Sequence, residues 1–168
     1  VAKQDLLETG VRSQLIMPIL YRPFDTRFTY YTGKSRGFIC RPRNEVMSHV
    51  IKKENLCLIS ARGVERSREY DQILCTNQII TNHTLSLKEN NSLFPLYIYP
   101  DTGNQQTNLF LEKNPNLSPE FLQDVREKLG KTPTPEDIFY YLYAILHSPT
   151  YRQRYADFLK RDFPRLPI

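Results

Sequence analysis

Four cationic side chains lie close together in residues 34–43, and phosphate contact is the chemistry that suits them best. Guanidinium and ammonium groups pair with phosphate oxygens, and Gly33 and Gly37 let the backbone approach an anion closely. Asn44 follows as a candidate helix N-terminus, whose free amides also favour an anion. A solvated basic hairpin is the alternative interpretation. The candidate phosphate contacts are Lys34, Arg36, Arg41 and Arg43.

A second cluster of charged residues follows at 62–70, between two apolar segments. Arginine can bond the major-groove edge of guanine with two N–H groups, and glutamate can accept a hydrogen bond from cytosine. The segment is equipped to read bases, and the alternative is a mobile surface loop whose charges pair with one another. We expect the guanidinium groups of both segments to converge on one concave surface that fits duplex DNA. The candidate base-reading residues are Arg62, Glu65, Arg66 and Arg68.

The distribution of charge along the chain indicates the kind of partner. Residues 21–70 contain eight arginines and three lysines against five acids, whereas the whole chain carries a net charge of +5. The remainder of the chain is therefore close to neutral. A cationic half favours a polyanionic partner, because each phosphate that is neutralised releases condensed counterions.

Two groups of aromatic residues could take part in stacking, but a role in holding the fold together is more typical of each. Residues 21–27 read Tyr-Arg-Pro-Phe-Asp-Thr-Arg, in which a guanidinium can stack on a ring. We predict that Asp25 holds Arg22 or Arg27 in a structural ion pair. Aromatic rings also fill residues 139–143 of a predicted helix, where core or interface packing is more typical than base stacking.

The sequence lacks the signatures of catalysis and of cofactor binding. Gly33-Lys34-Ser35 resembles the end of a P-loop, but that motif needs glycine at position 28, which is Phe28. No two glycines stand one residue apart, which argues against dinucleotide and adenosylmethionine loops. The three histidines and three cysteines lack metal-ligand spacing, and the odd cysteine count indicates a reducing cytoplasm. We therefore expect no catalytic, cofactor or metal residue and no membrane span.

The last third of the chain predicts three short helices, because a hydroxyl residue followed by proline starts each of them. The hydroxyl caps free amides, and proline fits the first helical position because no N–H is needed there. Gly130 stands where the first helix should end in a left-handed turn. Thr134 begins a capping box with Asp137. The three starts are Ser118-Pro119, Thr134-Pro135 and Ser148-Pro149.

The first two thirds favour β-structure. Short apolar and aromatic runs predict strands at 28–32, 37–40, 56–60, 72–75, 78–81 and 93–99. Asn44 is the predicted cap of a short helix at 45–52, and residues 100–115 predict a loop. The expected fold class is α+β, with a β-rich, mostly antiparallel N-terminal part followed by three short C-terminal helices. We expect one domain over residues 1–168, divided into a β-rich part at 1–117 and a helical part at 118–163.

Several motifs, spread over nearly the whole chain, keep an order that is specific to one family. They are Tyr21-Arg22-Pro23-Phe24-Asp25-Thr26-Arg27, Arg41-Pro42-Arg43, Phe94-Pro95-Leu96-Tyr97-Ile98-Tyr99-Pro100, Asn116-Leu117-Ser118-Pro119, Thr134-Pro135-Glu136-Asp137-Ile138-Phe139-Tyr140-Tyr141, Leu146-His147-Ser148-Pro149-Thr150-Tyr151-Arg152 and Asp162-Phe163-Pro164-Arg165. Together they resemble the C-terminal specificity domain of Type ISP restriction–modification enzymes. The chain begins at Val1 without a leader, so we expect it to be cropped from a longer polypeptide.

The resemblance implies a cytoplasmic parent polypeptide that combines a nuclease, an ATP-driven translocase and an adenine methyltransferase. S-adenosylmethionine, ATP and Mg would then be bound by other parts of the parent, and base extrusion would occur in the methyltransferase. This chain would read base edges of duplex DNA and contact the adjoining methyltransferase, with target choice within residues 62–93. The main alternative is a non-catalytic scaffold that docks on the methyltransferase and adds non-specific DNA affinity; RNA binding is a remoter one.

Overall fold

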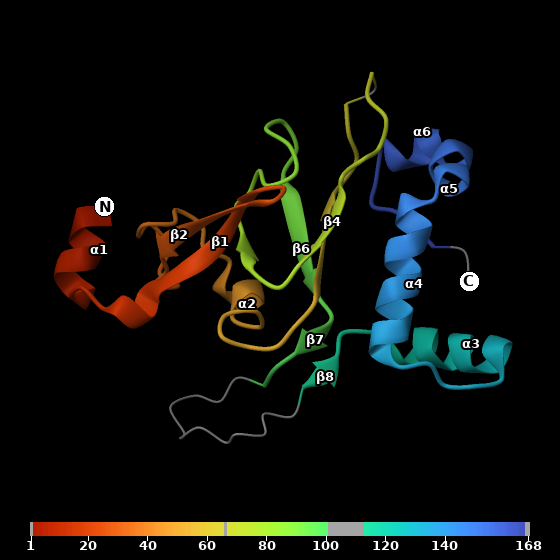
Figure 1. Ribbon diagram of the computed structural model, residues 1–168, viewed down its shortest axis with the longest axis horizontal. Coiled ribbons are helices and arrows are strands. Elements are labelled where there is room, and N and C mark those ends of the chain that lie inside the picture. The colour runs from red at the N-terminus through yellow and green to blue at the C-terminus, as the bar shows by residue number, and fades with distance from the viewer. Residues whose placement is uncertain (1, 66, 101–112, 167–168) are drawn as a thin grey trace.

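The computed structural model describes residues 2–65, 67–100 and 113–166, whose strands form two three-stranded sheets and a two-stranded ribbon (Figure 1). The first sheet has the order β2-β1-β5, in which β1 and β2 form an antiparallel hairpin and β5 runs parallel to β1. A register shift between Leu20 and Arg22 marks an irregularity close to the hairpin turn. The strands are β1 (Ile16–Arg22), β2 (Asp25–Tyr30) and β5 (Ile79–Ile80).

The second sheet is antiparallel and has the order β4-β3-β6. Its central strand β3 places Ile59 opposite Leu74 on one side and Leu93 on the other. The chain then continues from β6 into the short ribbon. The strands are β3 (Cys57–Ala61), β4 (Ile73–Thr76), β6 (Asn91–Pro95), β7 (Tyr97–Ile98) and β8 (Asn114–Pro115).

One apolar cluster joins the two sheets. Ile59 and Cys57 of β3 are 0% exposed, and they pack with Ile19 of β1 and Ile79 of β5. Burial raises the pKa of the Cys57 thiol to about 12, which keeps it protonated and unreactive. All three cysteines of the chain are free thiols, so the sheets are held together by packing rather than by a disulfide.

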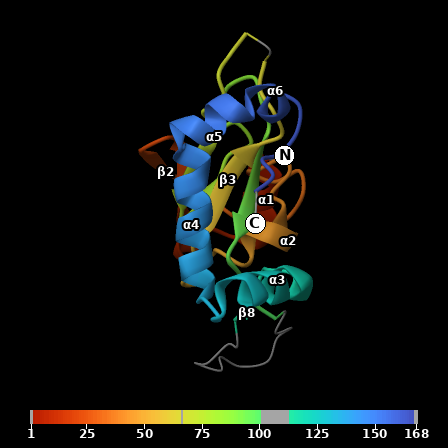
Figure 2. The same cartoon turned by 90° about the vertical axis from the view of Figure 1, so that its right-hand side faces the viewer.

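A second apolar cluster attaches the C-terminal helices to the second sheet. Leu159 and Leu146 are at most 2% exposed and pack with Ile73 of β4 and with Tyr70. Figures 1 and 2 show α4 alongside the second sheet, with α5 and α6 at one of its ends and α3 at the other. The helices are α3 (Pro119–Leu129), α4 (Pro135–His147), α5 (Pro149–Arg154) and α6 (Ala156–Leu159).

The predicted helix caps are confirmed. The side chains of Ser118, Thr134 and Ser148 accept hydrogen bonds from backbone amides of the following first turns. Asp137 completes the capping box with the backbone amide of Thr134. Gly130 adopts the left-handed conformation that ends α3, with φ 65°. These signals are local, so the sequence alone was sufficient to place them.

Four predicted elements differ from the structure. The predicted helix at 45–52 is only α2 (Asn44–Met47), and Arg43 rather than Asn44 occupies the N-cap, with no side-chain bond. Residues 37–40 form bends instead of a strand, because the Phe38 amide donates to Asp5. The predicted strand at 93–99 is interrupted at Leu96, whose amide donates to the Leu56 carbonyl. The third predicted helix is split into α5 and α6 at Tyr155, which has a non-helical backbone.

Four elements were missed, among them the strand β8 and the 3-10 turn η1 (Ser13–Leu15). Helix α1 (Ala2–Thr9) has no proline or cap signal in its sequence, and β1 contains Pro18, which cannot donate to a strand ladder. Part of the predicted loop at 100–115 lies outside the described residues, and its last two positions form β8. The α+β class, with mostly antiparallel sheets before the C-terminal helices, is confirmed. Within the described ranges, no helix combines the length and apolarity that crossing a bilayer requires.

Candidate DNA interface

The 62–71 loop joins β3 to β4 and is held at both ends by buried residues. Ala61 is 0% exposed at its start, and Tyr70 is 4% exposed at its other end. The hydroxyl oxygens of Tyr70 and Ser60 are 2.8 Å apart, and burial raises the pKa of Tyr70 to about 12, so the phenol stays neutral. Figures 1 and 2 show the loop at one end of the molecule, beside α5 and α6.

The start of this loop is attached to the segment that follows α6. Arg62 Nε donates to Asp162 Oδ1 over 3.1 Å, although the Arg62 side chain remains 72% exposed. The pKa of Asp162 is lowered by the Phe163 amide and by Arg62. Gly63 has φ +86°, and a Cβ atom there would lie 2.6 Å from the Lys160 carbonyl oxygen. Only glycine fits this contact, so the loop has a fixed position against α6.

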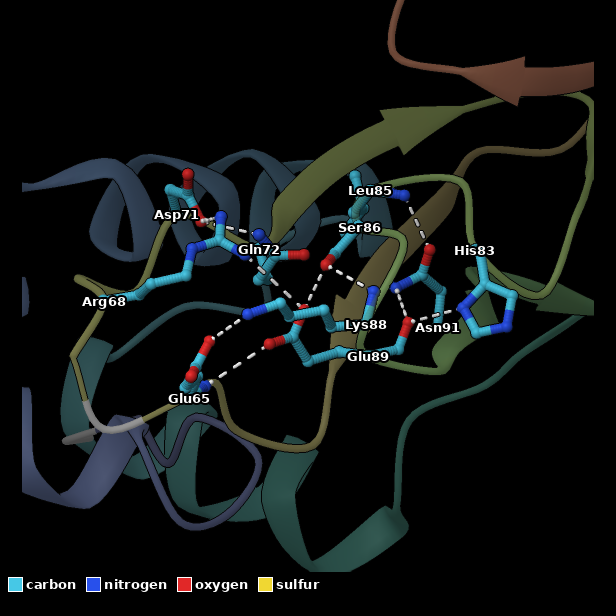
Figure 3. A network of polar contacts seen from close by, with 10 residues as sticks. All are labelled: Glu65, Arg68, Asp71, Gln72, His83, Leu85, Ser86, Lys88, Glu89 and Asn91. Carbon is cyan, nitrogen blue, oxygen red and sulfur yellow. Dashed lines mark hydrogen bonds and ion pairs between the residues drawn. The ribbon is translucent and has the colours of Figure 1, made fainter.

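A network of polar contacts joins the 62–71 loop to the 82–91 loop (Figure 3). Lys88 Nζ lies 2.5 Å from Glu65 Oε2, and Arg68 lies 3.6 Å both from Asp71 and from Glu89. Glu89 also accepts bonds from the Glu65 amide and from Ser86. The Ser86 hydroxyl makes the largest contribution to a lowered Glu89 pKa, so this carboxylate is ionised at neutral pH.

The 82–91 loop is closed by its own hydrogen bonds. The Asn91 amide donates to the Asn82 carbonyl over 2.9 Å, and Asn91 Oδ1 accepts from the Leu85 amide over 2.6 Å. The His83 ring nitrogen Nδ1 lies 3.2 Å from the Glu89 carbonyl oxygen (Figure 3). Thr84 is 0% exposed and donates to the Leu20 carbonyl of β1 over 3.0 Å. The loop is therefore fixed to the first sheet as well as to the 62–71 loop.

The turn of the β1–β2 hairpin follows Leu20, the residue to which Thr84 is bonded, and it contains the aromatic and arginine residues of the 21–27 motif. Arg27 makes bidentate bonds to Asp25, the shorter of them 2.9 Å, so the predicted structural ion pair is confirmed. The guanidinium groups of Arg27 and Arg22 lie 3.8 and 4.2 Å from the centre of the Tyr21 ring. Phe24 has φ 63° and is 93% exposed. The turn presents a bare aromatic ring beside two oriented cations.

The charged side chains of the 34–43 segment, unlike those of the 62–71 loop, are nearly all without an ion pair among the described residues. All four of its candidate side chains are exposed, and the closest ion pair is 3.8 Å between Arg43 and Glu45. Arg36 and Arg43 have left-handed backbones, with φ 62° and 50°. A Cβ atom at Gly37 would meet Asp5 of α1. Among the described residues, the side chains of Lys34, Arg36 and Arg41 make no ion pair, so their charges are available to a partner.

The two charged segments do not converge on one surface as the sequence had led us to expect. Figure 1 shows the 34–43 segment near α1, whereas the 62–71 loop lies beside α5 and α6 toward the opposite end of the long axis. Of the candidate base readers, Arg62, Glu65 and Arg68 are paired with oppositely charged side chains. Arg66 lies outside the described residues.

Sequence reasoning placed target choice within residues 62–93, which include the 82–91 loop, but it named no residue of that loop as a DNA contact. Lys88 and Glu89 stand 23 and 24 residues after Glu65, with no spacing signal to link them. The alternation of polar residues over 82–91, between two apolar strands, is the one feature that marks a structured loop. Core or interface packing was predicted for the aromatic rings of α4. Phe139 is buried in the core, whereas Tyr140 and Tyr141 are 59% and 57% exposed.

A cavity of about 550 Å³ lies between α3 and α4, with Val125, Leu129 and Tyr141 in its lining. Its wall is mostly apolar and has no glycine-rich phosphate loop, so it does not fit adenosylmethionine or ATP. In residues 2–65, 67–100 and 113–166, no three His, Cys, Asp or Glu side chains cluster as metal ligands would.

Comparison with known proteins identifies the class of domain that this arrangement represents. The chain belongs to the Type ISP C-terminal specificity domain family, whose model matches residues 2–168. The fold is also that of a chain in the cryo-electron microscopy structure of the DrdV–DNA complex, with a TM-score of 0.70 and 28% identity. That match covers 94% of this chain and 14% of the DrdV chain.

Two further solved structures share the fold. A nuclease-deletion mutant of the Type ISP restriction–modification enzyme LlaGI, in complex with a DNA substrate mimic, has a TM-score of 0.63 at 23% identity, over 95% of this chain and 12% of its own. The ATP-dependent Type ISP enzyme LlaBIII, bound to DNA, has a TM-score of 0.69 at 18% identity, over 99% and 10%. No curated protein sequence matches this chain. The chain thus spans a small part of the length of the solved proteins that it resembles.

Proposed function

We propose that this chain recognises a specific sequence in double-stranded DNA, as the target-recognition domain of a restriction–modification adenine methyltransferase. The observation that carries the proposal is the match of a specificity-domain family over residues 2–168. The DrdV relative, at 28% identity, is a DNA complex. Two loops that are hydrogen-bonded into a rigid unit provide the fixed geometry that reading base edges requires.

We assign different contacts to the two charged segments. The exposed cations of 34–43 contact phosphates, because among the described residues only Arg43 has an acid within ion-pair distance, and that pair is long and exposed. In the 62–71 loop, Arg62, Glu65, Arg66 and Arg68 read bases, since exposed ion pairs are weak enough to exchange for DNA contacts. Because the segments lie apart, they contact separate stretches of the duplex. The phosphate contacts are Lys34, Arg36, Arg41 and Arg43.

The rest of the parent polypeptide supplies the chemistry. Residues 1–168 form one domain, with a β-rich part at 1–117 and a helical part at 118–163, and this domain has no catalytic role. Methyl transfer, ATP-driven translocation and Mg-dependent cleavage belong to other parts, which bind S-adenosylmethionine, ATP and Mg. A cytoplasmic location fits the three free thiols.

Competition binding tests the proposal. The intact polypeptide is used to select duplexes from a random library, and the recovered site then competes with random duplex at physiological salt. A target-recognition domain prefers its site by about 10³-fold or more. Equal affinity for the selected and random duplexes would reject sequence-specific recognition.

The second candidate function is a scaffold that docks on the methyltransferase and binds DNA without sequence preference. It is favoured by the apolar cavity between α3 and α4, beside the exposed rings of Tyr140 and Tyr141. The wild-type sequence preference separates the two functions, because a scaffold shows none. Tyr141→Ser then tests the docking itself: under the scaffold function it weakens attachment to the methyltransferase, and under target recognition it leaves the preference for the selected site unchanged.

A further inference from the structure

The 82–91 loop exposes an apolar side chain and two amides on a rigid backbone, and none of its residues is among the DNA contacts assigned above. Leu87 is 75% exposed, and the neighbouring Lys88 side chain is 67% exposed. Asn82 and Asn90 are exposed where the loop begins and ends. A single exposed leucine is common on protein surfaces. Leu87 precedes Lys88 in a loop whose two ends carry the amide pair, and hydrogen bonds hold the backbone of this loop in place.

The two asparagines form a pair with unused bonding capacity. Asn82 Nδ2 donates to Asn90 Oδ1 over 2.7 Å. An amide pair joined by one such bond leaves one oxygen and one NH₂ group free, whichever amide donates. Among the described residues, Asn82 Oδ1 and Asn90 Nδ2 have no hydrogen-bond partner. The pair therefore offers one acceptor and one donor to solvent.

These groups match the major-groove edge of an A·T base pair. Adenine presents the N7 acceptor and the N6 amine donor there, and thymine presents its C5 methyl group. Amide groups are the usual partners of adenine, and apolar side chains contact the thymine methyl. The positive charge of Lys88 suits the phosphates that border the groove. A loop that exposes both a leucine and an amide pair thus carries the side-chain types that suit adenine and thymine rather than guanine and cytosine.

The loop also lies where DNA bound by the 62–71 loop would reach it. The Glu65 side chain bonds Lys88, and the Glu65 amide donates to Glu89 (Figure 3). Arg68 lies 3.6 Å from the same Glu89. A duplex whose bases are read by Arg68 therefore passes beside residues 86–90.

We propose that the 82–91 loop is a second base-reading element that recognises an A·T pair in the major groove. Leu87 contacts the thymine methyl group, and the Asn82–Asn90 pair bonds the adenine edge. This inference rests on the proposed function, because it requires a bound duplex.

Two atom-level changes in the DNA test the proposal with the intact polypeptide and its selected site. Uracil in place of each thymine removes one methyl group, and 7-deazaadenine in place of each adenine removes the N7 acceptor. At one A·T pair, wild-type affinity should fall about fourfold with uracil and about tenfold with 7-deazaadenine. Leu87→Ala should abolish the uracil effect at that pair, and Asn90→Ala should abolish the 7-deazaadenine effect.

Matched controls separate these effects from general damage. Leu7→Ala removes a leucine that is 70% exposed on α1, and Asn77→Ala removes an exposed asparagine before β5. Both should retain the wild-type response to each DNA change, and all four variants should unfold at the wild-type temperature. If Leu87→Ala or Asn90→Ala responds like wild type at every pair, the inference is overturned while sequence preference stands. If the wild type selects no sequence, the proposed function itself fails.

Discussion

The two arginine-bearing segments of this domain differ in what their charges do in the absence of DNA. In residues 34–43 the cations project from a chain packed on α1, and among the described residues their one ion pair is that of Arg43 with Glu45, at 3.8 Å. In the 62–71 loop, Arg62 and Arg68 are paired with acids from other segments, at 3.1 and 3.6 Å. The two segments have similar compositions, yet most cations of 34–43 are exposed without an ion pair among the described residues, whereas Arg62 and Arg68 of the 62–71 loop are oriented by acids.

The difference matters because the two tasks have different geometric requirements. A phosphate contact tolerates a mobile cation, since the attraction is long-ranged and depends little on orientation. A base contact needs a guanidinium held near one orientation, and neighbouring carboxylates provide that restraint. Substitutions in the two segments should have distinguishable consequences. Four substitutions follow in order of decreasing effect: three lie in these segments, and the last lies in the 82–91 loop that contacts one of them.

The largest effect should come from the glycine that fixes the 62–71 loop. Gly63→Ala places a Cβ atom 2.6 Å from the Lys160 carbonyl, at φ +86°. Strain and backbone displacement together should lower the free energy of unfolding by about 3 kcal/mol, measured by denaturant titration. Gly10→Ala is the matched control, because its φ is +67° with nothing within 4 Å, and it should lose about 1 kcal/mol. Equal losses would show that the loop is not held against α6.

Next in size is the effect of Arg68 on discrimination. Arg68→Ala should reduce the preference for the cognate base at one position by about 2 kcal/mol, with little change at other positions. Competition binding against single-base variants of the selected site measures it. Arg126→Ala removes an exposed arginine on α3 and should leave every preference unchanged. A uniform loss of affinity across all sites would assign Arg68 to phosphate contact.

A smaller, sequence-independent effect is expected in the other segment. Arg41→Ala should weaken binding to cognate and random duplexes alike and lower the slope of log K against log salt by about one unit. Its side chain has no ion pair among the described residues, so the whole charge is available to DNA. Titration between low and moderate salt measures the slope, again with Arg126→Ala for comparison. Loss of affinity for the cognate site alone would make Arg41 a base reader.

The smallest effect concerns pH. The folded-state pKa of Glu89 is below its ordinary value, so ionised Glu89 stabilises the fold above that ordinary value. The contribution disappears as pH falls from about 4.5 through the lower folded pKa. Glu89→Gln should therefore flatten the acid side of the stability profile by about 0.5 kcal/mol, seen in melting temperatures between pH 6 and 3. An unchanged profile would mean that the Ser86 hydroxyl and the other contacts of Glu89 do not stabilise the ionised carboxylate.

Local signals allowed the C-terminal half of the fold to be predicted, and long-range contacts limited the rest. Three helix starts could be predicted because each cap hydroxyl accepts a hydrogen bond from the backbone amide three residues later; the caps are Ser118, Thr134 and Ser148. The Arg62–Asp162 pair joins residues 100 positions apart, and nothing near Arg62 in the sequence indicates its partner. The bends at 37–40 depend on Asp5 of a helix that carries no cap signal.

The same limit applies to the candidate site. Residue types alone identified Arg62, Glu65 and Arg68 as side chains able to read bases, since that ability is a property of each side chain. Their arrangement depends on Lys88 and Glu89, which belong to a different loop. The expectation of one shared surface failed because charge composition does not encode where two loops lie relative to each other (Figure 1).

The bonds between the 62–71 and 82–91 loops have a consequence for changing the target of such a domain. Exchange of residues 62–71 alone would leave Lys88 and Glu89 facing foreign side chains, with their charges unmatched. If these loops read bases as proposed, retargeting by loop grafting requires both loops from the same donor, together with a threonine equivalent to Thr84 that attaches them to β1. Natural diversification of target sequence should likewise alter the two loops together.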